Sequence, residues 1–66
     1  PEISPDALVP GDLVFFSTAT RGPSHVGIAV SASEFVHAPS SSGAVRVERL
    51  TTPYWTSRFV GIRRVF

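Results

Sequence analysis

Short apolar segments separated by turn residues run through the chain, and they predict a sheet of about five short strands. The strand-like runs are 12–16, 26–30, 34–37, 44–50 and 59–66. The run 44–50 alternates apolar and charged residues, which is the period-2 pattern of a half-exposed strand. The pattern therefore predicts a mainly β fold: a small, bent antiparallel sheet or an open barrel of about five strands.

The segments between these runs predict turns and a single helical turn. Pro10-Gly11 suits a type II turn, because Pro fixes φ at the second position and Gly tolerates positive φ at the third. Pro1–Val9 is expected to be an extended lead-in, and 18–24 and 39–43 are expected to be loops. Within 51–57, Thr52 suits a helix N-cap and Pro53 the first helical position. At 66 residues the chain has room for one small domain.

Two histidines stand at the outer ends of neighbouring strand-like segments. His25 begins the first segment and His37 ends the second, and a three-residue loop over 31–33 would join them as a hairpin. This loop pairs Ile28 with Val36, so the two histidines share one face with Cβ atoms about 5–7 Å apart. One imidazole could then act as a base and the other as its orienting partner. A loop of two or four residues would place them on opposite faces.

The same register predicts which face of the hairpin forms the core. The aliphatic residues all fall on the face away from the histidines: Val26, Ile28, Val30, Val36 and Ala38. We expect this face to be buried. Gly27 would lie opposite His37 and leave open space between the two imidazoles. Tyr54, Trp55 and Phe59 are expected to plug the core.

Composition and charge narrow the classes of function. The formal net charge is +1 and all six basic residues are Arg without a clustered tract, which argues against nucleic-acid binding. No apolar run approaches the roughly 20 residues that span a bilayer. Asp12 is expected to be a turn residue, and Arg63-Arg64 to snorkel at a strand end. Without cysteine, two imidazoles make a poor zinc site, and no metal or cofactor is expected.

A series of motifs closely resembles the C-terminal half of the NlpC-type cell-wall peptidases, which are papain-like cysteine peptidases, mostly of bacteria. The motifs, in order, are LVPGDLVFF (8–16), HVGI (25–28), FVHAPSS (35–41), VRVE (45–48), YW (54–55) and RFVGIRRV (58–65). The resemblance covers nearly the whole chain from Leu8. It implies that residues 1–66 are the β portion of an α+β papain-like domain, with His25 as catalytic base and His37 as the third polar residue. Ala29 departs from the family pattern, which commonly has an aromatic residue there.

The resemblance also implies a nucleophile that this chain lacks. The family's catalytic Cys begins a helix well upstream of the Pro-Gly-Asp motif, whereas this chain contains no Cys. The isolated chain is therefore expected to be inactive and to need an N-terminal half, in cis or as another chain. By resemblance, the intact enzyme would cut peptidoglycan stem peptides next to D-glutamate and a diamino acid, in the bacterial cell envelope, periplasmic or secreted. The isolated chain is also expected to self-associate through its uncovered apolar surface.

Two other interpretations stay open from the sequence. An SH3-like module that binds bacterial cell wall or peptides fits the length and the number of strands, but it leaves His25 and His37 unexplained. A truncated relative with a structural or inhibitory role is the other. A Cys-bearing upstream helix would favour the enzyme, and a cleft of aromatic residues away from both histidines would favour the binding module.

Overall fold

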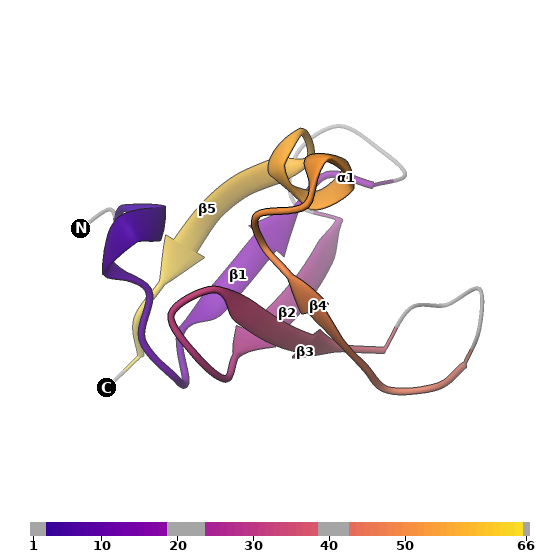
Figure 1. Cartoon of the computed structure of the whole chain (residues 1–66), viewed down its shortest axis with the longest axis horizontal. Helices are drawn as coiled ribbons and strands as arrows, with labels where there is room; N and C mark the ends of the chain where they lie inside the picture. The colour runs from indigo at the N-terminus through magenta and orange to yellow at the C-terminus, as the bar shows by residue number, and fades with distance from the viewer. Residues whose placement is uncertain (1–2, 19–23, 39–42, 66) are drawn as a thin grey trace.

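The computed structural model describes residues 3–18, 24–38 and 43–65. Within these ranges it has one antiparallel sheet of five strands in the order β4-β3-β2-β1-β5 (Figure 1). The elements are η1 (Pro5–Ala7), β1 (Leu13–Phe16), β2 (His25–Ala29), β3 (Glu34–His37), β4 (Arg46–Arg49), α1 (Pro53–Thr56) and β5 (Phe59–Arg63). The mainly β prediction is confirmed, and each predicted strand is found. The predicted loops at 19–23 and 39–42 lie outside the described residues.

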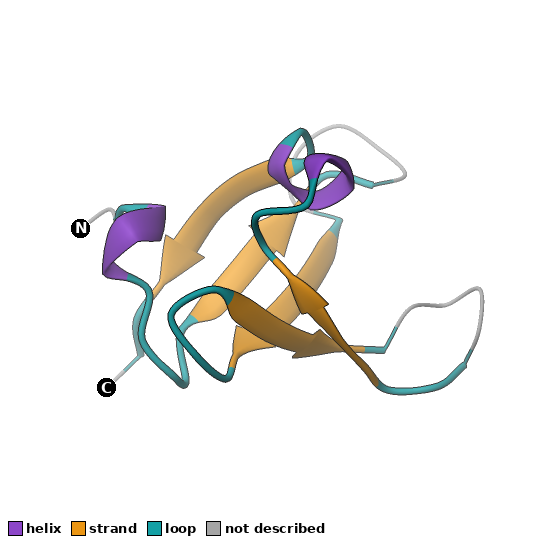
Figure 2. Ribbon diagram, viewed as in Figure 1, coloured by secondary structure: helices purple, strands orange, loops and turns teal. Residues whose placement is uncertain are grey.

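The short helix α1 links the two edge strands of the sheet and closes over one of its faces. β4 and β5 stand at opposite edges, and the sheet curls so that α1 lies between them (Figure 2). Trp55 of α1 points into the sheet and packs on Phe16 of β1 and Phe35 of β3, with ring centroids 4.8 and 5.2 Å away. The face that α1 covers is called the inner face below, and the opposite face the outer face.

The inner face carries the core. Its buried apolar residues come from all parts of the chain: Leu8, Val14, Phe16, Ala29, Phe35, Leu50, Trp55 and Ile62. Phe16 and Phe35 are fully buried and pack with ring centroids 4.9 Å apart. Phe35 also explains Gly27, because a Cβ at Gly27 would lie 2.5 Å from the Phe35 ring. Gly27 thus makes room for a core ring, whereas the sequence predicted space between the imidazoles.

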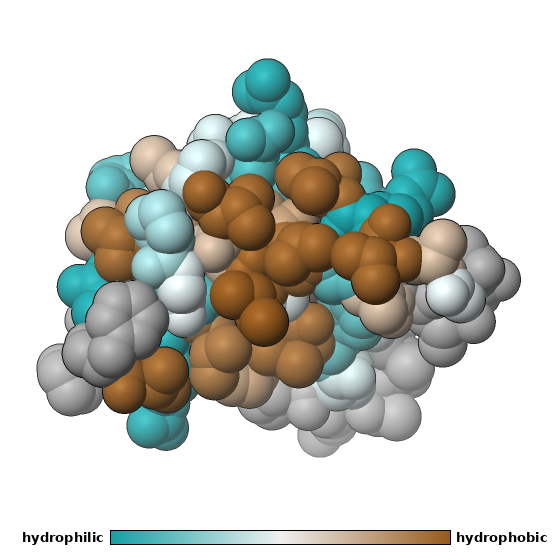
Figure 3. Space-filling model, turned by 90° about the horizontal axis from the view of Figure 1, so that it is seen from below, coloured by the Kyte–Doolittle hydropathy of each residue, from teal (hydrophilic) through white to brown (hydrophobic). Residues whose placement is uncertain are grey.

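The prediction of the buried face was wrong. Val26, Ile28 and Val30 are 46%, 47% and 46% exposed, and they lie on the outer face. Figure 3 shows hydrophobic residues gathered over the centre of the molecule seen from below. The histidine face is buried because α1 and its Trp55 pack on it, and the large aromatic rings of three elements meet there. The aliphatic residues of the hairpin have no such covering element among the described residues.

The turn at Pro10-Gly11 forms as predicted, and its neighbour Asp12 binds an arginine far along the chain. Gly11 has φ of 94°, and the Asp12 N–H donates to the Val9 carbonyl at 3.2 Å. Arg64 donates from Nε and Nη2 to the fully buried Asp12 carboxylate at 2.8 and 2.9 Å. Arg64 also donates to the Ala7 carbonyl at 2.9 Å. Snorkelling of Arg64 is therefore a wrong prediction, because its guanidinium closes an ion pair that fixes the C-terminal end of the sheet to the N-terminal segment.

The two helical segments compare differently with the sequence. The lead-in was predicted to be extended, but Pro5–Ala7 forms a 3-10 helix. Ser4 accepts from the Asp6 N–H at 3.3 Å and Pro5 has a φ suited to a first helical position, which together favour this turn. The predicted helical turn at 53–56 is confirmed with Thr52 as N-cap residue. The Thr52 hydroxyl donates to the Arg49 carbonyl at 3.0 Å, so it makes no capping bond.

Candidate active site

The predicted hairpin register brings the two histidines together on the inner face. The observed pairs Ile28↔Val36 and Ala29↔Phe35 are those of the three-residue loop. His25 opens β2 and His37 closes β3, so both stand at the same end of the sheet. His25 Nε2 and His37 Nδ1 are 2.8 Å apart, which is a hydrogen bond, and the rings are nearly perpendicular at 88°. The predicted juxtaposition of His25 and His37 is thus present.

A carboxylate continues this pair on the next strand. His37 Nε2 lies 3.2 Å from Glu48 Oε2 of β4, and the His37 side chain is fully buried. Glu48 is opposite Phe35 in the β3–β4 register, so it stands on the inner face beside the core. Glu48 was not among the site residues predicted from the sequence. The available signal was its place in the alternating run 44–50, where it falls on the face that carries Phe35 and His37.

Aromatic rings pack against the histidine pair. Trp55 stacks on His25 with an interplanar angle of 21°, and it meets His37 edge-on at 83°. Phe16 lies against His25, and Phe35 lies against His37. The buried aromatic residues of the described chain therefore gather around the histidines. This arrangement favours a catalytic pair over the wall-binding module, for which an aromatic cleft away from both histidines was expected.

Burial sets the charge state of His25. Its pKa is lowered from the usual 6.5, first because burial disfavours the charged ring and second because a charge on His37 would repel it. His25 is therefore neutral at neutral pH and can accept a proton. Since Nε2 of His25 is engaged with His37, the proton acceptor available to a third group is Nδ1.

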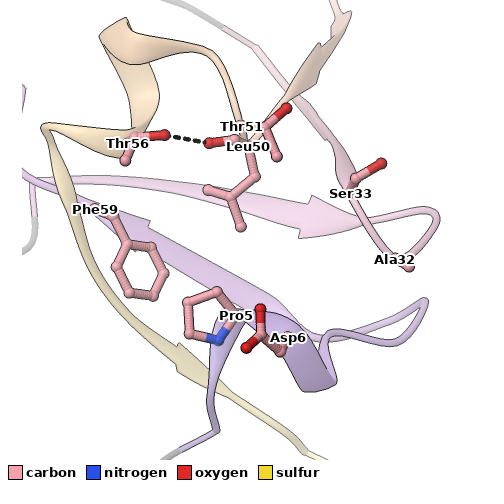
Figure 4. A pocket seen from close by; sticks show the side chains of 8 residues that line it. All are labelled: Pro5, Asp6, Ala32, Ser33, Leu50, Thr51, Thr56 and Phe59. Carbon is pink, nitrogen blue, oxygen red and sulfur yellow. Dashed lines mark hydrogen bonds between the residues drawn. The ribbon is translucent and has the colours of Figure 1, made fainter.

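A hollow of about 440 Å³ lies elsewhere on the molecule and contains neither histidine. It opens between η1, the turn after β2 and the region around α1 (Figure 4). Its lining is Pro5, Asp6, Ala32, Ser33, Leu50, Thr51, Thr56 and Phe59. The Thr56 hydroxyl already donates to the Leu50 carbonyl at 2.9 Å. The walls are mostly apolar, so the hollow is suited to apolar packing more than to chemistry.

The described residues offer no metal site and no membrane-spanning helix. Across 3–18, 24–38 and 43–65, no group of three or more His, Cys, Asp or Glu is placed to hold a metal ion. None of the helices in these ranges is long and apolar enough to cross a membrane. The serine run 40–42, which belongs to the loop expected at 39–43, lies outside the described residues.

Comparison with known proteins places this chain in a family. The sequence profile of the NlpC/P60 family matches residues 1–64. The "Probable endopeptidase NlpC" of Escherichia coli strain K12 is 42% identical over 65 residues, which cover 97% of this chain and 42% of that protein. The "Probable peptidoglycan endopeptidase LytE" of Bacillus subtilis strain 168 is 43% identical over 54 residues, or 82% of this chain and 16% of that protein.

The fold agrees with the sequence comparison. The crystal structure of a lipoprotein-like protein of the NLP/P60 family from Staphylococcus aureus superposes with a TM-score of 0.79 at 31% identity, covering 97% of this chain and 22% of that one. The chain spans less than half the length of each of these relatives. Because the family profile matches nearly all of its residues, the chain belongs to the NlpC/P60 family.

Proposed function

We propose that residues 1–66 are the C-terminal β portion of a peptidoglycan endopeptidase that works by thiol catalysis, with His25 as base and His37 as its orienting partner. The 2.8 Å contact between the two imidazoles carries this proposal. The surrounding aromatic rings and the family membership support it. Two relatives, LytE and NlpC, bear the name of endopeptidases, and LytE is named for peptidoglycan.

In this proposal His25 moves one proton back and forth through Nδ1. A free thiol with a pKa near 8.5 is mostly protonated at neutral pH, and transfer of its proton to His25 leaves a thiolate beside an imidazolium. The thiolate attacks the amide carbon, and the imidazolium returns the proton to the leaving amine as the C–N bond breaks. Water then gives a proton to His25 and its hydroxide to the acyl carbon. The C–S bond breaks, which releases the acid, and the imidazolium returns its proton to the sulfur.

The thiol must come from outside these 66 residues, which contain no cysteine. We infer that a helical half bearing the Cys precedes this portion in the same protein or joins it as another chain. The hollow of Figure 4, with Pro5, Leu50 and Phe59 among its walls, is a fitting seat for part of that half. A Cys at a helix N-terminus would also gain acidity from the helix dipole, which makes it a better match for a neutral His25.

The proposed substrate is the stem peptide of peptidoglycan. By resemblance to the family, the bond cleaved lies next to D-glutamate and a diamino acid. Because peptidoglycan lies outside the cytoplasmic membrane, the proposed location is the bacterial cell envelope, periplasmic or secreted.

The test uses a reconstituted protein, in which the chain is joined at Pro1 to the Cys-bearing N-terminal half of an NlpC/P60 relative. It is incubated with purified muropeptides, and released peptide fragments are separated by chromatography. We expect cleavage by the reconstituted protein and none by the 66-residue chain or by a reconstituted variant with the Cys replaced by Ala. Cleavage by the chain alone would contradict the thiol mechanism. Binding of muropeptides without cleavage by the folded reconstituted protein would favour the wall-binding module.

A further inference from the structure

The second nitrogen of His37 has a partner that the catalytic pair does not account for. We propose that Glu48 is a positioning residue: its carboxylate holds the His37 ring so that the His25–His37 hydrogen bond runs in one direction only. This inference rests on the proposed function of the pair. Glu48 meets the far nitrogen of His37 and not His25, so it acts through His37.

The geometry assigns both nitrogens of a buried ring. The His37 side chain is fully buried, and a buried polar atom without a partner is costly. Nδ1 of His37 meets His25 at 2.8 Å and Nε2 meets Glu48 at 3.2 Å. With both nitrogens bound, the ring can neither flip nor rotate without losing a hydrogen bond.

The direction of the hydrogen bonds from His25 through His37 to Glu48 follows from the chemistry of the carboxylate. An ionised carboxylate only accepts hydrogen bonds, so His37 Nε2 must carry a hydrogen. A neutral His37 then has its lone pair on Nδ1, which must accept from Nε2–H of His25. The lone pair of His25 is thereby placed on Nδ1, the atom that would take the thiol proton. If Glu48 were absent, His37 could carry its hydrogen on Nδ1 instead, and the proton of His25 would move to Nδ1 and block the base.

The negative charge of Glu48 also bears on the protonated pair. When the histidine pair takes up a proton, the Glu48 carboxylate beside His37 attracts the positive charge. Among the described residues, three charged or titratable groups lie in or beside the hydrogen-bonded series that includes His37. They are His25, Glu48 and Arg46, and Arg46 Nε lies 3.8 Å from Glu48 Oε2. Arg46 is 59% exposed, so solvent screens its pull on Glu48. The neighbours of the pair on β1 and α1, Phe16 and Trp55, carry no charge.

The experiment compares Glu48→Gln and Glu48→Ala with Glu34→Gln in the reconstituted protein. Glu34→Gln is a matched control, because this substitution removes the same charge from the neighbouring strand. The Glu34 carboxylate meets the Ser31 hydroxyl at 3.2 Å and does not contact a histidine. Gln keeps the size of Glu48 but can donate as well as accept, so it no longer fixes the direction of the His25–His37 hydrogen bond. We expect kcat to fall about tenfold to a hundredfold in both Glu48 variants, with KM nearly unchanged, as for other residues that orient a reacting group. Glu34→Gln should keep the parent kcat.

A second readout does not depend on turnover. NMR titration of the imidazole Cε1–H signals gives the apparent pKa at which the histidine pair takes up its first proton. Loss of the Glu48 charge should lower this apparent pKa, whereas Glu34→Gln should leave it in place. Glu48 variants that match Glu34→Gln in both kcat and this pKa would overturn the positioning role. A parent protein without activity would count against the proposed function, while the titration would still decide the role of Glu48.

Discussion

The inner and outer faces of the sheet are both apolar, yet only one of them is a core. On the inner face Phe16, Phe35 and Trp55 interlock and leave almost no exposed surface. On the outer face Ile28 of β2 and Val47 of β4 lie on either side of Val36 in β3, and both stay about half exposed. The two faces differ in burial because a helix, α1, packs on the inner face only. The single turn of α1 delivers one large indole to the inner face, and that face also holds the histidine pair.

The largest effect on folding should come from a ring of the inner face. Phe35→Ala removes a fully buried side chain that contacts Phe16 and Trp55, and should cost about 3–5 kcal/mol of unfolding free energy. Val47→Ala on the outer face should cost less than about 1 kcal/mol, because Val47 is 58% exposed. Urea unfolding of the reconstituted protein measures both. Equal losses would break the distinction between the two faces.

The next effect falls on activity at the inner face. His37→Ala should lower kcat of the reconstituted protein by about tenfold to a hundredfold, because His37 only orients and polarises His25. His37→Asn should recover part of this loss, since an amide can still accept from His25. Val36→Ala is the control, being the neighbour on β3 that points to the outer face. A His37→Ala variant with parental kcat would remove His37 from the mechanism.

Lowering the pH should destabilise the fold in two separate ranges, one set by Asp12 and one by His25, which lie at opposite ends of the inner face. Hydrogen bonds from Arg64 lower the pKa of Asp12 from 3.8 to about 2, so Asp12 stabilises the fold above pH 3.8 and this stabilisation is lost as pH falls toward 2. Burial lowers the pKa of His25 below 6.5, so protonation favours the unfolded chain and stability begins to decline as pH falls below 6.5.

The two ranges can be separated by one substitution. Thermal unfolding is followed from pH 8 to pH 2 in the reconstituted protein and in Asp12→Asn. We expect the variant to lose the decline between about pH 4 and 2 and to keep the decline that begins near 6.5. A variant with an unchanged low-pH decline would assign that decline to other carboxylates.

The smallest effect should come from the outer face. Val26→Thr together with Ile28→Thr should change the unfolding free energy by about 1 kcal/mol or less, because both side chains are nearly half exposed. The same change should weaken self-association of the 66-residue chain, since it would interrupt the exposed apolar surface to which Val26 and Ile28 belong. Sedimentation velocity over a range of concentrations measures this. A parent chain that stays monomeric at high concentration would contradict the self-association.

Local features of the fold were predictable because they depend on neighbours in the sequence. The three-residue loop fixed the register of β2 and β3, and with it the shared face of His25 and His37. Pro10-Gly11 and Thr52-Pro53 marked their turn and helix through the φ preferences of proline and glycine. Family resemblance then gave the two histidines their proposed roles.

The features that sequence analysis missed depend on contacts between distant segments. Arg64 binds Asp12 across 52 residues, and Glu48 meets His37 across 11. Alternation along a strand says that two faces differ, but it does not say which face another element will cover. Here the aliphatic face of the hairpin was predicted to be the core. The opposite face is buried instead, because Trp55 packs on Phe16 and Phe35 there.

Two adjacent residues provide the most direct test of whether His25 on the inner face is the base of a thiol peptidase. His25 and Val26 are consecutive in β2 and point to opposite faces. Muropeptide cleavage is measured for His25→Ala and Val26→Ala in the reconstituted protein at equal folded concentration. We expect His25→Ala to lose turnover by orders of magnitude, because without the base the thiol has no proton acceptor, while Val26→Ala stays near the parent. Full turnover by His25→Ala would contradict this role of His25.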